Sequence, residues 1–122
     1  SIDRGMPTTV DIKKETLMAG LSCGEVSEIA WEILKPALSH SMSIGDDGIP
    51  NLMRLFARGE FGNEPIEAGE CAASGLAALL IAKKNPGIWQ SLNFDQYSDI
   101  LLIGTEGATD PILYEKLISE SK

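Results

Sequence analysis

Apolar side chains recur at helical spacing in three parts of the chain. In residues 26–38, 49–56 and 112–118 they fall mostly three or four positions apart. Since this spacing gathers apolar side chains on one face of a helix, we predict three amphipathic helices. The three faces consist of Val26, Ile29, Ala30, Ile33, Leu34, Ala37 and Leu38; Ile49, Leu52, Met53 and Phe56; and Ile112, Leu113, Leu117 and Ile118.

Sequence signals mark both the start and the end of the first of these helices. Ser22 and Glu25 have the spacing of a capping box, and Ser27 is an alternative cap. Pro36 is expected to bend the last turn, because proline lacks the amide that a helix interior uses.

The other two helices have acidic residues and prolines at their starts. Asp46 or Asp47 is the expected cap of the second helix, with Pro50 in its first turn. Asp110 followed by Pro111 is a strong start signal for the last helix.

The remaining apolar stretches have no amphipathic pattern. Residues 72–82 are small or apolar on nearly every side, which predicts a helix buried all round, and residues 64–69 before it favour a short strand or extended segment. The stretch TTVDI at 8–12 favours an edge strand. Residues 100–103 lack polar alternation, which favours a parallel strand covered on both faces.

These elements predict a helix-rich α/β fold with few strands. Two or three short strands among several helices leave a sheet little to pair with. We therefore expect residues 1–122 to form a single segment of a larger α/β enzyme.

Composition and charge exclude several classes of function. The chain has 122 residues, 43% of them hydrophobic, and a formal net charge of −8. Its Lys and Arg residues are scattered, so we expect no nucleic-acid partner and no membrane surface. No apolar stretch is long enough to span a bilayer, and the first ten residues carry no targeting signal.

The cysteines and the histidine do not form a metal motif. Cys23, Cys71 and His40 lie far apart in the sequence, so we expect no metal site and a reduced, cytoplasmic protein. Both cysteines are expected to be small buried side chains, and His40 a surface residue.

Three segments gather glycines and polar residues at the ends of elements, at 18–20, 68–71 and 104–107. Each is typical either of a ligand site or of a plain turn, and none has a phosphate-loop motif. Glu70 has an alternative role as an acidic residue in the first turn of a helix, and Glu106 is expected to shape its own turn.

Three longer stretches, TLMAGLSCGEVSEIAWEIL, GECAASGL and GTEGATDPILY, together resemble the carboxyl-terminal part of the 2,3-diaminopropionate ammonia-lyase family. The resemblance covers nearly the whole chain. It implies the helix-rich carboxyl-terminal segment of the large domain of a pyridoxal phosphate enzyme of fold type II, built like the tryptophan synthase β subunit. It further implies a homodimer that eliminates ammonia from 2,3-diaminopropionate and releases pyruvate, with the cofactor ring as electron sink.

The family pattern implies cofactor contacts for five residues. Ala19 and Gly20 would lie against a face of the pyridine ring, and Glu70 near its far edge. Gly104 and Thr105 would lie near the ring nitrogen.

The chain departs from the family pattern at two positions. The family has serine where this chain has Gly104, so only Thr105 can supply a hydroxyl at that turn. Ala72 stands in place of a glycine and adds a methyl group.

No catalytic residue is expected in the chain, because the Schiff-base lysine and the phosphate-binding loop of the family lie amino-terminal to these stretches. We therefore expect the segment alone to be inactive and to self-associate through exposed apolar faces. The alternatives are a threonine or serine dehydratase-like lyase of the same fold, and a non-catalytic stand-alone module. The lysines belong to no motif and are expected at the surface or at helix ends: Lys13, Lys14, Lys35, Lys83, Lys84, Lys116 and Lys122.

Overall fold

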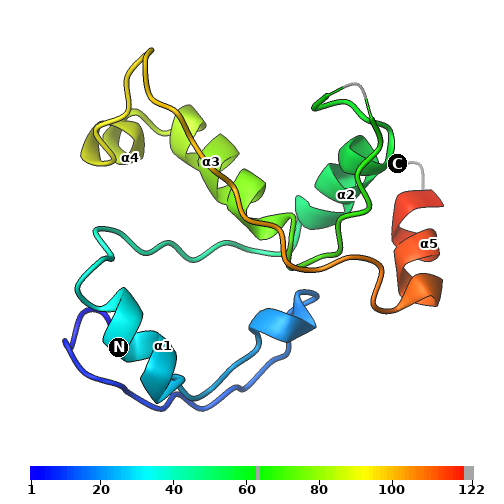
Figure 1. The fold of residues 1–122 in the computed structure, drawn as a ribbon. Helices are drawn as coiled ribbons and strands as arrows, with labels where there is room; N and C mark the ends of the chain where they lie inside the picture. Colours follow the sequence, from blue (N-terminus) through cyan, green and yellow to red (C-terminus); the bar gives the residue numbers. More distant parts are fainter. Residues whose placement is uncertain (63, 120–122) are drawn as a thin grey trace. The chain divides into compact units, whose positions relative to one another are not determined.

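A computed structural model describes residues 1–62 and 64–119 of the chain. The chain divides into two compact units, Ser1–Ser43 and Ile44–Lys122. The elements are η1 (Ala19–Leu21), α1 (Glu28–Leu34), α2 (Ile49–Ala57), α3 (Ser74–Lys84), α4 (Pro86–Ser91) and α5 (Pro111–Ser119), and Figure 1 labels the five α-helices. The predicted helix-rich character is confirmed.

The first unit contains η1, α1 and the loops around them. Ser27 caps α1, because its side chain accepts a hydrogen bond from the amide of Ala30 at 3.3 Å. The alternative cap is therefore the right one, and α1 is shorter at each end than the apolar pattern predicts, ending before Pro36. A loop approaches Gly24 closely, since a Cβ there would lie 2.7 Å from the carbonyl oxygen of Val10.

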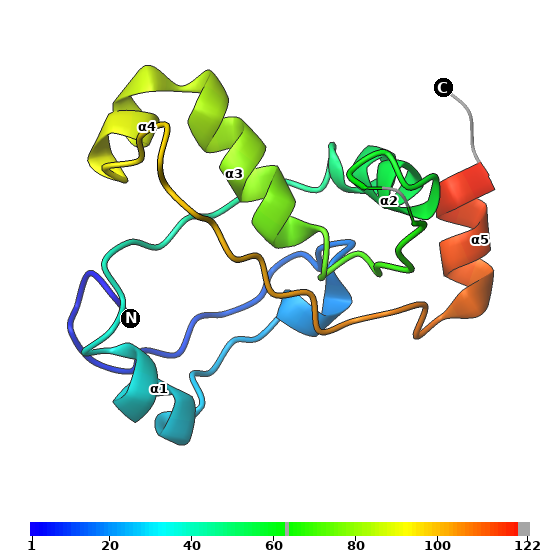
Figure 2. The same ribbon diagram turned by 45° about the horizontal axis from the view of Figure 1, so that its top comes forward.

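The core of the second unit forms around α2. Helix α2 packs against α5 and α3, and α3 packs against α4, as Figures 1 and 2 show. The Arg54 guanidinium donates a hydrogen bond to the carbonyl oxygen of Leu117 at 2.8 Å and so joins α2 to the last turn of α5. The buried apolar side chains of these helices are Ile49, Leu52, Met53, Ala77, Ala82, Tyr114 and Leu117.

Helix α2 starts differently from the prediction. Its N-cap is Gly48, with no capping side chain, so the predicted Asp46 or Asp47 cap is wrong. The backbone oxygen of Asp46 instead accepts the amide of Ile49 at 3.0 Å. Pro50 lies in the first turn as predicted, and after the helix Gly59 has a φ of +70°, a conformation that suits glycine.

Helix α5 starts as predicted. The Asp110 carboxylate accepts the amide of Leu113 at 3.0 Å, and Pro111 is the first helical residue. Its inward face includes Leu117, but the prediction for Ile112 is wrong, because this side chain is 85% exposed. Helix α3 is also less buried than predicted, since Ile81 is exposed.

Residues 1–62 and 64–119 contain no β-strand, which corrects the predicted strands at 8–12 and 100–103, and at 64–69 leaves the alternative of an extended segment. A strand exists only where another backbone completes its hydrogen-bond ladder. Residues 8–12 have one such bond, from the amide of Val10 to the oxygen of Gly24. Residues 99–105 make no backbone hydrogen bond within the described part of the chain, although they run extended alongside α3 in Figures 1 and 2.

Tyr114 is buried, and we expect its phenol to make the stability of the second unit sensitive to alkaline pH. Burial raises the pKa of Tyr114 above its ordinary value of 10.0, with a smaller contribution from the negative charges of Glu67 and Glu115. The unfolded chain therefore gives up this proton more readily than the folded chain does. We expect the free energy of unfolding to fall as the pH rises above about 10, and Tyr114→Phe to abolish that part of the fall.

Chemical denaturation at pH values on both sides of 10.0 measures this effect. Tyr97→Phe is the matched control, because Tyr97 is 82% exposed. The prediction is contradicted if the free energy of unfolding of Tyr114→Phe falls as steeply above pH 10 as that of the unmodified chain.

None of the helices in the described ranges has the length and apolar character that crossing a membrane requires.

Candidate functional site

Two loops of the second unit, 67–73 and 104–108, lie side by side. The amide of Gly69 donates to the carbonyl oxygen of Glu106 at 3.0 Å, and the amide of Cys71 donates to the Glu106 carboxylate at 2.7 Å. In the opposite direction, the amide of Ala108 donates to the Glu67 carboxylate at 2.9 Å. These bonds join segments about 35 to 41 residues apart in the sequence.

Glycines allow the two loops to come this close. A Cβ at Gly69 would lie 2.4 Å from the carbonyl oxygen of Gly107 and 2.7 Å from the Glu106 carboxylate. A Cβ at Gly107 would lie 3.0 Å from the Glu67 carboxylate. Only glycine fits at position 69 without moving the backbone of the opposite loop.

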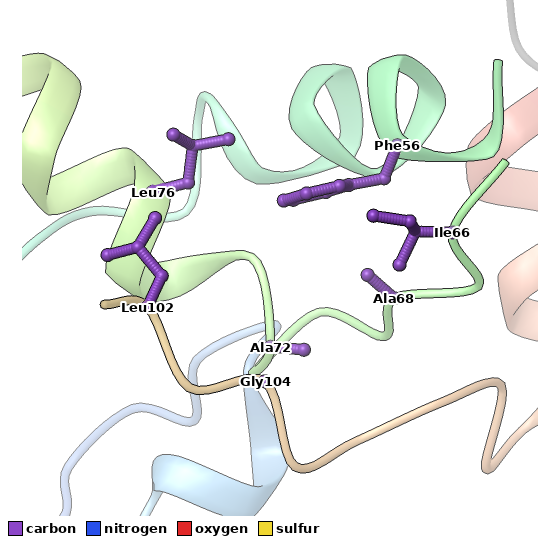
Figure 3. Close-up of a pocket in the computed structure, with 7 residues that line it drawn as sticks. All are labelled: Phe56, Ile66, Ala68, Ala72, Leu76, Leu102 and Gly104. Atoms are coloured by element: carbon purple, nitrogen blue, oxygen red, sulfur yellow. The ribbon is translucent and has the colours of Figure 1, made fainter. Parts of the chain in front are cut away.

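An apolar pocket of about 240 Å³ opens beside these loops. Figure 3 shows the ring of Phe56 reaching from α2 toward Leu76, with Ala72 and Gly104 close together at the base. A Cβ at Gly104 would lie 3.4 Å from the Cβ of Ala72, so a larger side chain would crowd this base. The pocket is lined by Phe56, Ile66, Ala68, Ala72, Leu76, Leu102 and Gly104.

The structure gathers three of the five predicted cofactor contacts in these loops. Gly104 lines the pocket, Thr105 follows it as an exposed residue, and Glu70 lies half-buried between Gly69 and Cys71. Glu70 precedes α3 and its N-cap Ala73, so the alternative role in the first turn of that helix is wrong.

The other two predicted contacts belong to the first unit. Ala19 and Gly20 form η1 with Leu21, and both are exposed. The turn is closed by the amide of Leu21, which donates to the oxygen of Met18 at 2.8 Å, and the Cys23 thiol lies 3.8 Å from the oxygen of Gly20.

Sequence reasoning missed the carboxylates that join the two loops. Glu106 is predicted to shape its own turn, yet its side chain reaches the amide of Cys71, and the sequence pattern assigns no role to Glu67. The available signal is the pairing of an acidic residue with a nearby glycine in both loops, Glu67 with Gly69 and Glu106 with Gly107.

The candidate metal ligands of the described residues form no cluster. Among residues 1–62 and 64–119 no three His, Cys, Asp or Glu side chains are placed to hold a metal ion. His40 is exposed as predicted, and its Nδ1 lies 3.1 Å from the Ser39 hydroxyl. Cys23 is exposed and Cys71 half-buried, so the prediction of two buried thiols is wrong.

The described lysines lie at the surface as predicted, and Lys122 falls outside the described residues. Lys35 packs over the ring of Trp31 at 5.8 Å from its centroid, and Lys83 and Lys84 form the last turn of α3. None of the lysines in the described part lines the pocket.

The extended run at 100–103 exposes apolar side chains beside the pocket. Leu101 is 85% exposed and Ile103 is 76% exposed, and alternate residues of an extended chain point the same way. Exposed apolar side chains on an unpaired backbone favour pairing with another chain. We expect the isolated chain to self-associate, and the double variant Leu101→Lys with Ile103→Lys to weaken the association by roughly tenfold or more.

Sedimentation velocity over a range of concentrations measures this, and binding of a hydrophobic dye reports the exposed surface. Ile112→Lys is the control, because Ile112 is equally exposed but lies on α5. If the double variant and the unmodified chain self-associate equally strongly, residues 100–103 do not form the contact between the chains.

Comparison with known proteins finds diaminopropionate ammonia-lyases. The chain is 34% identical to the enzyme of Escherichia coli over 111 residues, which are 88% of this chain and 28% of that enzyme. It is 34% identical to the enzyme of Salmonella typhimurium over 121 residues, which are 96% of this chain and 30% of that enzyme. No family model matches the chain. The resemblance identified from the sequence is confirmed, and the chain spans less than a third of the length of these relatives.

Proposed function

We propose that the chain is the carboxyl-terminal part of a pyridoxal phosphate-dependent diaminopropionate ammonia-lyase of fold type II, a cytoplasmic homodimer. The observation that carries the proposal is the identity of 34% across nearly the whole chain to enzymes of that name. The substrate is 2,3-diaminopropionate and the products are pyruvate and ammonia.

The residues of the second unit fit one part of the cofactor. The pocket side chains are apolar, and the small residues Ala72 and Gly104 form its base, so the described lining would present an apolar surface to a flat ring. Among the residues that the structure describes, no cation lines the pocket, so these residues would offer a phosphate no counter-charge. These residues are suited to packing against the cofactor ring. In the proposal, the phosphate-binding loop and the Schiff-base lysine belong to the remainder of the enzyme.

When bound, pyridoxal phosphate supplies the electron sink for loss of the α-proton and expulsion of the β-amino group. The residues of this chain would bind and orient the cofactor ring. With the cofactor bound, Gly104 and Ala72 would leave room for the ring, Thr105 would supply a hydroxyl near the ring nitrogen, and Glu70 would supply a carboxylate near the ring edge. A neutral hydroxyl at that nitrogen would leave the pyridine unprotonated and would moderate the electron sink.

Pyruvate release by the full-length protein that contains this segment tests the proposal. We expect kcat/KM for pyruvate release from 2,3-diaminopropionate to be at least about tenfold higher than kcat/KM for pyruvate release from serine. We expect the same margin over keto-acid release from threonine. A preference for serine or threonine favours the dehydratase alternative. A protein without lyase activity on any of them contradicts the proposal.

The 122-residue chain alone should form no stable adduct with pyridoxal phosphate, because its described lysines are exposed and a reactive lysine needs a desolvated pocket. A visible absorbance band that survives dialysis and disappears on borohydride reduction contradicts this expectation. A monodisperse, cooperatively unfolding chain with no dye-binding surface favours the stand-alone module.

A further inference from the structure

We propose that Glu67 and Glu106 are positioning residues that hold loops 67–73 and 104–108 at one fixed register, so that Glu70 and Thr105 face the same cofactor. The two carboxylates and the amides of Ala108 and Cys71 form what we term the carboxylate clamp. The cofactor part of this inference rests on the proposed function, and the clamp itself rests on the contacts of the second unit.

The clamp works in both directions. Glu106 belongs to the second loop and accepts the amide of Cys71 in the first, at 2.7 Å. Glu67 belongs to the first loop and accepts the amide of Ala108 in the second, at 2.9 Å. Because the two bonds tie two positions of one loop to two positions of the other, a shift of one loop along the other would break both bonds.

Glycines fix the place of each carboxylate. A Cβ added at Gly69 would lie 2.7 Å from the Glu106 carboxylate. A Cβ added at Gly107 would lie 3.0 Å from the Glu67 carboxylate. The backbone bond from Gly69 to the oxygen of Glu106, at 3.0 Å, adds a third tie between these contacts. The loops therefore interlock through two carboxylates and two glycines.

The clamp holds residues adjacent to the predicted cofactor contacts. Glu70 directly precedes Cys71, whose amide is bound, and Thr105 directly precedes Glu106, whose backbone and side chain are both bound. Each clamp carboxylate accepts an amide of the opposite loop, and in the proposal it acts through that contact on the neighbouring residues. Glu106 is half-buried and Glu67 is exposed, so Glu106 carries the larger share.

Amide hydrogen exchange of the 122-residue chain tests the clamp directly. We expect Glu106→Ala to speed exchange at the Cys71 amide by roughly tenfold or more, because a hydrogen bond to a charged group is lost. Glu106→Gln should retain most of the protection, since its amide oxygen still accepts. Glu67→Ala should act in the same way on Ala108, and to a smaller extent. Glu60→Ala, which removes an exposed carboxylate just after α2, is the matched control and should change neither amide.

Pyridoxal phosphate affinity of the full-length protein tests the positioning role. We expect Glu106→Ala to raise the dissociation constant by about tenfold and Glu106→Gln to restore most of the affinity. Unchanged exchange at Cys71 in Glu106→Ala overturns the clamp. Faster exchange with unchanged cofactor affinity overturns the positioning role. A wild-type protein that binds no pyridoxal phosphate overturns the proposed function and the positioning role together, while the exchange result still decides whether the clamp exists.

Discussion

Gly69→Ala is expected to lower the free energy of unfolding of the second unit by about 1–3 kcal/mol, the usual cost of forcing an extra methyl group into a close contact. The new Cβ would lie 2.4 Å from the carbonyl oxygen of Gly107, which is backbone and cannot rotate away. The positive-φ glycines of the described residues are Gly5 and Gly59, so the cost at Gly69 comes from space and not from backbone conformation. Relief requires loops 67–73 and 104–108 to separate.

Urea denaturation measures this loss of stability when the free energies of unfolding of Gly69→Ala and of the control Gly45→Ala are compared. A methyl group at Gly45 would have no heavy atom within 4 Å beyond its chain neighbours, and Gly45 has no positive φ, so alanine there should be neutral or stabilise by about 0.4–1 kcal/mol. Faster exchange at the amides of Cys71 and Ala108 in Gly69→Ala would show that the loops have separated. Equal stability of the two variants would mean that the loops do not touch at Gly69.

Local signals predict the helices of this chain well. The cap and proline at Asp110 and Pro111 act within one turn, and the structure has both in place. The same holds for Ser27, whose side chain bonds an amide three residues ahead. Asp46 is not the cap of α2, because Gly48 occupies the N-cap position, and the backbone oxygen of Asp46 accepts the amide of Ile49.

Long-range pairing is what the sequence does not predict. Residues 100–103 have the composition of a buried strand, but a strand also needs a second backbone, and the described part of the chain offers them none. Glu106 bonds an amide 35 residues earlier and Glu67 one 41 residues later, distances at which no local pattern operates. The pocket likewise joins α2, α3 and two loops, so only the folded chain brings Phe56 to Gly104.

Met53→Ala is expected to lower the free energy of unfolding of the second unit by about 2–5 kcal/mol, the range for truncating a large buried side chain to alanine. Met53 is 0% exposed and lies on α2, the helix that packs against α5 and α3. The cost includes both the lost burial and the cavity that rigid neighbours leave unfilled. Met53→Leu keeps most of the volume and should cost less than about 1.5 kcal/mol.

Ile112→Ala is the matched control on a helix surface, because Ile112 is 85% exposed and its truncation should change stability by no more than about 0.5 kcal/mol. Met53 lies one turn before Phe56, so a loosened α2 also moves the aromatic wall of the pocket. Met53→Ala in the full-length protein should therefore weaken pyridoxal phosphate binding as well as stability, whereas Ile112→Ala should affect neither. If Met53→Ala and Ile112→Ala cost the same, α2 is not the centre of this unit, and the pocket has no rigid wall with which to hold a ring.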